Sequence, residues 1–570
     1  MSKFNNGHVK GILKTKGTKF VNGDGEEIIL NGYGTPNWMN VEGFMIGGEL
    51  KDYRYNLFPG PGADHNPERF TSRRFVSQTV RELCGSKYLE DFWYRVAEAH
   101  MAEDDIKLMA DVGFNVVRLV LNANHLLKEE PGIEWDERAF EHLTRVMDWC
   151  EKYKIYAILD MHAPVGGNNG ATGDGLFCEF PNVFLDAESR ERTILLWEEL
   201  ARRYSDRWIL AGYDLINEPV SSPVQEEYIP LLVEFYDECI ARIRKIDKEH
   251  IFFLEGSKFA RDNRIFNKEY DPGYHNWAIS IHLYGASPEI KDLYPFLLKC
   301  QEWDVPLWLG ECGAGPIGNA VFFDICAHYG IAYTPWGFKT AMGGGGRKPG
   351  SVGHPLPKDW NKINDYITAR AGRPSYEECQ KIFDEYIENM KLENCTINYD
   401  GFRLSKKHPD IDIPGVGYDM FLEDGSRYYG NWELSNYLDF RLEDHTKLVW
   451  ATDKVYPYPV FAHYRDPHAK RYSPMDDLAF ELTAGEFANY TVHEVKNTCT
   501  VTLMGASAEG AVIEATCNGE VIGTFTMPVN ADILNPVASN TLTIPAAEDA
   551  VVKLTVKSGT VQIKTVKFAY

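Results

Sequence analysis

The sequence of 570 residues lacks an apolar run long enough to cross a membrane, and it lacks an excess of basic residues. Lys and Arg number 59 against 83 Asp and Glu, which gives a formal net charge of −24. Nucleic acids and anionic membranes are bound through basic patches, which so acidic a chain is poorly suited to present. The composition favours a neutral substrate and no nucleic-acid or membrane partner.

Cysteine follows no pattern in this chain. The 11 cysteines form no C-x-x-C motif and no Cys/His spacing suited to zinc, so we expect reduced, mostly buried thiols and no metal or organic cofactor. The initial stretch MSKFNNGHVKGILKTKG has no apolar core of signal-peptide length. The sequence therefore predicts a cytoplasmic protein.

Short apolar segments of strand length recur through the first two thirds of the chain. Eight of them span residues 27–34, 115–121, 156–162, 212–217, 251–256, 278–284, 306–311 and 331–338. Amphipathic stretches of helix length lie between most of them, such as 136–153 and 189–207. The alternation predicts an α/β fold, a (β/α)8 TIM barrel.

The chain is too long for one ordinary domain. We assign residues 1–395 to the barrel, including a closing helix over 375–390, and residues 396–475 to an irregular, aromatic-rich connecting segment. Residues 476–570 contain alternating Val- and Thr-rich segments, and the Asn-Gly pair at 518–519 predicts a hairpin. This region is predicted to be a small antiparallel β-sandwich.

Tryptophan is absent from residues 451–570, although the chain contains 13 tryptophans. Polysaccharide-binding domains stack sugars on flat aromatic faces. The absence favours a structural or oligomer-forming role for the sandwich over a binding module, and it leaves a homo-oligomer possible.

Polar residues stand at the carboxyl ends of the predicted strands. They are Arg118, His162, Asn217, Glu218, His282, Tyr284, Glu311 and Trp336. Each alone has an explanation in core packing or structural pairing. Together they are expected to converge on one mouth of the barrel, where core packing would demand apolar side chains.

Two of these residues are glutamates, and no metal-ligand spacing or nucleotide-binding loop accompanies them. One carboxylic acid that protonates a departing oxygen and one carboxylate that attacks carbon or activates water suit glycoside hydrolysis. Asn217, beside Glu218, can hydrogen-bond a sugar 2-hydroxyl. A non-catalytic carbohydrate-binding protein on the same scaffold is the alternative, although such a protein usually lacks one carboxylate.

The ordered motifs Arg-Leu at 118–119, DMHAPVGGNNG, LINEP, SIHLYG, WLGEC and TPWGFK resemble glycoside hydrolase family 5, a family of retaining (β/α)8 enzymes. The resemblance covers about residues 25–392. It implies that Glu218 is the acid/base, Glu311 the nucleophile and Tyr284 its hydrogen-bond partner.

The same resemblance implies roles for the other strand-end residues. Arg118 would keep Glu311 ionised, and His282 would assist Glu218. His162 and Asn217 would bind the glycone, with Trp336 as the floor of its subsite. Cys312 and Gly313, which follow Glu311, depart from the Phe-Gly or Trp found in many members.

The substrate expectation rests on the long loop after the first strand. NWMNVEGFMIGG in this loop resembles intracellular bacterial exo-β-mannosidases of the family, including those that split mannosyl-β-1,4-N-acetylglucosamine. The HAPVGGNNG stretch also resembles exo-glucanases, so a β-glucosidase, an exo-β-glucanase and an endo-acting β-glycanase stay open. We expect a blind, exo-acting pocket walled by Trp38, Asn40 and Glu42 and by aromatic residues after the eighth strand.

Overall fold

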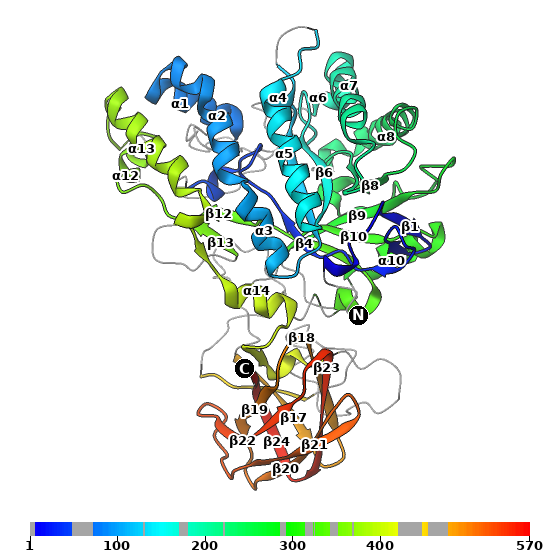
Figure 1. Ribbon diagram of the computed structural model, residues 1–570, viewed down its shortest axis with the longest axis vertical. Helices are drawn as coiled ribbons and strands as arrows, with labels where there is room; N and C mark the ends of the chain where they lie inside the picture. The colour runs from blue at the N-terminus through cyan, green and yellow to red at the C-terminus, as the bar shows by residue number, and fades with distance from the viewer. Residues whose placement is uncertain are drawn as a thin grey trace.

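The computed structural model of the chain contains a barrel with surrounding helices and a smaller all-β domain. The helix α14 (Tyr399–Lys406) connects these two parts (Figure 1). It describes residues 6–47, 72–128, 132–169, 181–220, 223–284, 292–313, 323, 325–342, 351–367, 370–419, 447–453 and 477–570. Among these residues, no helix combines the length and the apolar character needed to cross a bilayer.

Eight parallel strands form the barrel sheet, in chain order. They are β4 (Gly32–Gly34), β5 (Val116–Asn122), β6 (Tyr156–Ala163), β7 (Leu210–Asp214), β8 (Ile251–Glu255), β9 (Trp277–Tyr284), β10 (Leu307–Gly313) and β11 (Ala332–Pro335). The first and last strands meet where the Tyr333 N–H donates to the carbonyl of Leu30. The predicted (β/α)8 fold is confirmed.

The predicted first strand, 27–34, is divided in the structure. Its first part is β3 (Glu27–Ile28), which joins β1 (Lys14–Lys16) and β2 (Lys19–Val21) in a separate antiparallel sheet. The break falls at residues 29–30, and the next residue, Asn31, forms a bridge with Tyr333 of β11 and donates its backbone N–H to the side chain of Asn115. Only β4 enters the barrel.

Helices follow most of the strands and bury their apolar faces against the barrel. They are α3 (Glu103–Asp111), α4 (Ala123–Leu126), α5 (Glu137–Tyr153), α6 (Asn182–Leu185), α7 (Ala187–Tyr204), α8 (Ile229–Ile243), α9 (Ser257–Ala260) and α10 (Tyr294–Trp303). Asp136 and Asp186 cap α5 and α7 by accepting backbone N–H groups of the first turn. These two helices match the stretches predicted at 136–153 and 189–207.

A second helical layer stands beside the barrel. It contains α1 (Arg73–Cys84), α2 (Ser86–His100), α12 (Trp360–Ile367) and α13 (Tyr376–Asn389). The predicted helix at 375–390 exists as α13, but it packs against α1 and α2 in a separate apolar cluster instead of closing the barrel. Loop residues Val41 and Ile46 belong to this cluster, which therefore anchors the loop after β4.

The loop after β11 contributes two short strands, β12 (Lys339–Ala341) and β13 (Val352–His354), and β14 (Thr396–Ile397) pairs with the second. Trp360, farther along the chain, donates its indole N–H to the carbonyl of Gly47 at 2.7 Å. The chain segments that follow the first and the last barrel strands are thereby tied to each other.

The C-terminal domain is the predicted antiparallel sandwich. One sheet has the order β16-β17-β24-β19-β22 with β15 paired to β24, and the other has the order β18-β23-β20-β21. The strands are β15 (Ile411–Pro414), β16 (Lys447–Trp450), β17 (Leu478–Thr483), β18 (Phe487–Val495), β19 (Cys499–Ala506), β20 (Ala511–Cys517), β21 (Glu520–Met527), β22 (Val537–Ile544), β23 (Ala547–Ser558) and β24 (Thr560–Ala569). Asn518 and Gly519 form the predicted hairpin turn with φ of 50° and 87°.

The segment 396–475, predicted to be irregular, contains α14 and supplies β15 and β16 to the sandwich. The first strand of the domain therefore lies upstream of residue 476. Pairing with β24, which comes last in the chain, sets β15 in place, and such a distant partner leaves no local sequence signal.

The sandwich docks at the amino-terminal ends of the barrel strands. Lys406 at the end of α14 donates through Nζ to Asn31 Oδ1 at 2.5 Å and to the carbonyl of Gly113 at 3.0 Å. Both acceptors precede a barrel strand, and the neighbouring Lys407 carbonyl accepts the N–H of His493 in β18. The accessory domain therefore lies away from the carboxyl ends of the barrel strands (Figure 1).

Candidate active site

All the polar strand-end residues predicted from the sequence lie at one mouth of the barrel. Arg118 is in β5, His162 in β6, His282 and Tyr284 in β9, and Glu311 in β10; Asn217 and Glu218 follow β7, and Trp336 follows β11. The carboxyl ends of parallel barrel strands meet at one face. Most of these side chains contact one another there.

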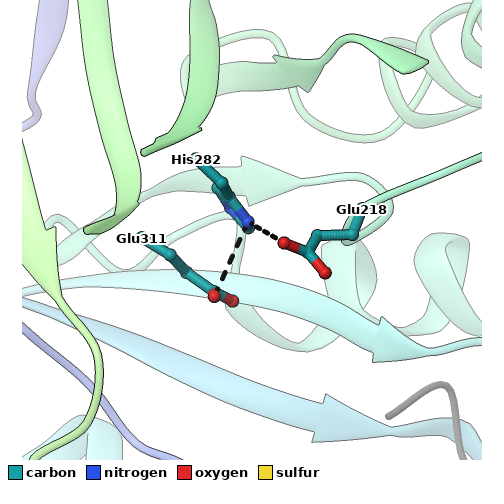
Figure 2. A group of neighbouring side chains, drawn as sticks. All are labelled: Glu218, His282 and Glu311. Carbon is teal, nitrogen blue, oxygen red and sulfur yellow. Dashed lines mark hydrogen bonds and ion pairs between the residues drawn. The ribbon is translucent and has the colours of Figure 1, made fainter. Parts of the chain in front are cut away.

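The two glutamates face each other across His282 (Figure 2). His282 Nδ1 is 2.9 Å from Glu218 Oε1 and 3.6 Å from Glu311 Oε2. One carboxylate oxygen of each glutamate and a ring nitrogen of the histidine all lie within 4.8 Å of one another. The arrangement leaves a narrow space between two carboxyl groups.

Glu311 is held as a carboxylate. Arg118 donates from Nη1 to Oε1 at 2.8 Å, and Tyr284 donates its hydroxyl to Oε2 at 2.6 Å. Burial alone would raise the pKa of Glu311, but the positive charges of His282 and Arg118 and the hydrogen bond from Tyr284 hold it at about 2. An ionised, hydrogen-bonded carboxylate suits a nucleophile.

Glu218 has the opposite electrostatic environment. Its side chain is 22% exposed and contacts His282. Burial raises the pKa of Glu218, the nearby charge of Glu311 raises it further, and the hydrogen bond from His282 offsets only part of the effect. The pair thus combines one carboxyl group whose pKa is raised with one whose pKa is lowered, the opposition that an acid and a nucleophile require.

Sequence reasoning missed three carboxylates beneath this pair. Arg118 donates from Nε to Asp214 at 2.9 Å, and its Nη2 lies 3.1 Å from both Asp160 and Glu255. All three acids are fully buried. The sequence does contain a signal for these three residues, because each is an acidic residue inside an apolar strand. The stretches are AILDMH, GYDLI and FFLEG.

The turn that carries Glu218 is strained. Glu218 has φ of 43° and Val220 has φ of 52°, a left-handed conformation that costs a non-glycine residue about 1–2 kcal/mol. Asn169 donates its amide to the Glu218 carbonyl at 3.1 Å, and Asn168 donates to the Asn217 carbonyl. These buried asparagines of the GGNNG stretch, to which the sequence assigned no role of their own, hold the turn in place.

The expected glycone side of the site also forms a group. The His162 ring stacks on Trp336 with centroids 5.2 Å apart and planes 3° apart. His162 Nδ1 is 2.9 Å from Asp160, and its Nε2 is 3.4 Å from the Asn217 amide nitrogen. His162 is buried and Trp336 is partly exposed, so the indole ring, held by this stack, is the suitable floor for a sugar ring.

The loop after β4 supports the predicted pocket wall only in part. Burial raises the pKa of Glu42 to about 7, with the charges of Glu311 and Glu218 also raising it, which indicates that this side chain lies near both glutamates. Asn40 is buried and accepts a hydrogen bond from Asn122 at 3.0 Å. The structure corrects the expectation that Trp38 walls the pocket. Trp38 has no exposed surface and packs edge-on against His142, so it supports the loop from the core.

Glu218, His282 and Glu311 also have the donor types of a divalent metal site. Both ring nitrogens of His282 already lie near carboxylates, Nδ1 at Glu218 and Nε2 3.1 Å from Glu255. Burial would lower the pKa of His282, but Glu255, Glu311 and Glu218 raise it well above its usual value.

Comparison with known proteins places this barrel in a family. Residues 76–341, which hold seven of the eight barrel strands, match the family model described as Cellulase (glycosyl hydrolase family 5). The family predicted from the ordered motifs is confirmed.

Relatives of this family 5 domain are named for several sugars. A β-xylosidase of Phanerodontia chrysosporium is 32% identical over 282 residues, which are 49% of this chain and 54% of that protein. A probable glucan 1,3-beta-glucosidase A of Emericella nidulans is 26% identical over 297 residues, 48% of this chain and 69% of that protein. The chain thus spans about half the length of the β-xylosidase that it matches.

Solved structures similar to this chain include an endogalactoceramidase. That similarity covers 97% of this chain and 100% of the other, with a TM-score of 0.42 and 14% sequence identity. A β-glucanase of Saccharophagus degradans matches over 67% of this chain and 94% of its own, with a TM-score of 0.39 and 16% identity.

Proposed function

We propose that this protein is a retaining β-glycoside hydrolase in which Glu311 is the nucleophile and Glu218 the acid/base. The observation that carries the proposal is the close, electrostatically opposed pair: oxygens of the two carboxyl groups lie within 4.8 Å. Retaining glycosidases keep their carboxyl groups about 5–5.5 Å apart, whereas inverting enzymes separate them by about 6.5–9.5 Å to admit a water.

In the first step, Glu311 attacks the anomeric carbon and forms a glycosyl ester while the proton of Glu218 passes to the departing oxygen. Arg118 and Tyr284 keep the attacking carboxylate ionised and oriented. In the second step, Glu218, now a carboxylate, takes a proton from water. The resulting attack on the anomeric carbon breaks the ester and frees Glu311.

The glycone lies against the His162–Trp336 pair in this proposal, with Asn217 directed at its 2-hydroxyl. The resemblance of the loop after β4 supports an exo-β-mannosidase acting on short manno-oligosaccharides or mannosyl-β-1,4-N-acetylglucosamine. The names of the relatives support β-xylosides and β-glucosides as the second candidates. The sandwich, docked at the opposite end of the barrel, has a structural role.

Nitrophenyl β-mannoside, β-glucoside and β-xyloside, followed by disaccharides with reducing-end N-acetylglucosamine, separate these substrates. We expect hydrolysis of at least one of the aryl glycosides. Activity on glucosides or xylosides alone would remove the mannosidase assignment and leave the two-glutamate mechanism in place. Binding of oligosaccharides without hydrolysis would favour the non-catalytic alternative.

The product is expected to retain the anomeric configuration of the substrate, because two inversions at the same carbon restore it. Early-time proton NMR of the released sugar, before mutarotation, should show the β-anomer. Initial release of the α-anomer would overturn the proposal. The same rate in EDTA as in buffer is expected, and a loss restored by a divalent ion would instead indicate metal-assisted hydrolysis.

Exo action is the expected cleavage pattern. The chain segments after β4 and β11 are tied to each other at Trp360 and Gly47, and together they would close the side of the mouth that holds the non-reducing sugar. A time course on mannopentaose or cellopentaose should release one monosaccharide at a time. Early accumulation of di- and trisaccharides would show an open cleft and an endo-acting enzyme.

A further inference from the structure

Glu255 is a buried carboxylate that the two-glutamate mechanism does not use. It ends β8 and has no exposed surface. Its Oε1 lies 3.1 Å from both Arg118 Nη2 and His282 Nε2, and its Oε2 accepts the backbone N–H of Glu218 at 2.6 Å. A single side chain thus contacts the arginine that orients the nucleophile, the histidine between the two glutamates and the turn of the acid/base.

Burying an unpaired carboxylate is costly, so its partners are expected to carry positive charge. Tyr236 of α8 packs behind Glu255, where its hydroxyl donates to the Glu255 carbonyl at 2.8 Å, and it brings no charge. Arg118 is shared with three other acids. His282 is the partner whose positive charge depends on a titratable ring proton.

Carboxyl groups surround His282. Glu218 faces its Nδ1 from the end of β7, Glu311 faces it from β10, and Glu255 faces its Nε2 from β8. Arg118 of β5 supplies the opposing positive charge, and Asp214 of β7 also interacts electrostatically with this histidine. Of the three facing acids, Glu255 is the one that the proposed reaction leaves unchanged.

We propose that Glu255 is a positioning residue that keeps His282 in its imidazolium form, so that a fixed positive charge stands between Glu218 and Glu311 throughout turnover. The inference rests on the proposed function, since it assigns the electrostatic support of the same two carboxylates. During the glycosyl-ester stage Glu311 is neutral, and during the leaving-group stage Glu218 gives up its proton. Glu255 stabilises the imidazolium in both stages.

Glu255→Gln tests the proposal because the amide keeps an oxygen acceptor for the Glu218 N–H and removes the charge. In nitrogen-15 histidine spectra, wild-type His282 should stay doubly protonated through neutral pH, whereas the variant should lose a ring proton between about pH 5 and 8. Above that pH the kcat/KM of the variant should fall in step with the loss of the ring proton, because Glu311 then loses a cation 3.6 Å away, whereas wild type should show no such fall near neutral pH.

Asp160→Asn is the matched control. Asp160 is also fully buried, lies 3.1 Å from the same Arg118 Nη2 and contacts a histidine, His162, at 2.9 Å. Its loss should leave the His282 signals unchanged. A His282 that stays doubly protonated in Glu255→Gln, or one that loses its ring proton equally in both variants, would overturn the inference.

Thermal unfolding of each variant establishes that it is folded across the pH range used. If Glu255→Gln does not unfold cooperatively, Glu255→Asp takes its place, since it keeps the charge but moves it back by one methylene. The changes in the His282 spectra and in the pH profile are then expected to be smaller than in Glu255→Gln. Spectra and profiles identical to wild type would contradict the proposal. A wild-type protein that hydrolyses no glycoside would refute the proposed function, whereas the His282 spectra would still test Glu255.

Discussion

Glu311→Gln should reduce kcat on every hydrolysed glycoside by about 10⁴-fold or more, because the amide cannot form the glycosyl ester. The loss should be the same for good and poor leaving groups, since both require attack by Glu311. Substrate binding should persist, because His162, Trp336 and Asn217 are untouched. Steady-state kinetics with several aryl glycosides and calorimetric binding of the product sugar measure these two effects.

Glu302→Gln is a suitable control for this variant, because Glu302 is an exposed glutamate of α10 that pairs with Lys299 on the surface. It should have wild-type kinetics. Retention of more than about a hundredth of the activity in Glu311→Gln would assign the nucleophile to another residue. The location of the ester can be checked independently by mass spectrometry after reaction with a 2-deoxy-2-fluoro glycoside.

Glu218→Ala should have a loss that depends on the leaving group. Glycosides with poor leaving groups should lose about 10²–10⁴-fold in kcat/KM, because their departing oxygen needs a proton. Dinitrophenyl glycosides should react in the first step nearly as fast as with wild type, because dinitrophenolate leaves unprotonated. A burst of dinitrophenol should follow, since the second step has lost its general base.

Azide is the diagnostic addition for the same variant. It needs no base to attack the glycosyl ester, so it should accelerate the slow phase and yield a β-glycosyl azide. Equal losses of activity on dinitrophenyl and alkyl glycosides, with no burst and no effect of azide, would contradict the assignment of Glu218 as the acid/base and Glu311 as the nucleophile. Asp262→Ala offers a comparison at an acid that lies among surface cations instead of among the strand-end residues.

The strand-end residues were predictable because a parallel barrel converts sequence position into spatial position. Residues such as His162, Asn217 and Glu311 stand at or near the end of an apolar run, and the carboxyl ends of these runs meet at one mouth. Alternating strands and an Asn-Gly turn similarly sufficed for most of the sandwich. Both signals are local, and the fold brings the local pieces together by general rules of packing and connection.

The missed features depend on partners that are distant in the chain. Asp160, Asp214 and Glu255 are significant because Arg118 lies among them and two of them also contact a histidine, and a single sequence does not report these contacts. The expectation that Trp38 walls the pocket failed for a related reason, since its place in the loop after the first strand did not reveal its buried contact with His142 of α5. Side-chain direction in an irregular loop has no periodicity from which to infer it.

The pairing of β15 with β24 sets where the accessory domain begins in the chain, because β15 belongs to the sandwich. A shortened chain that ends at residue 475 would deprive β15 of its hydrogen-bonding neighbour and uncover Ile411 and Ile413, which are buried in the sandwich core. An exposed strand edge with apolar side chains is a template for association with other chains. Exchange of the accessory domain between related proteins should therefore carry the segment from about residue 399 onward as a unit, with Lys406 as the contact to be matched on the barrel.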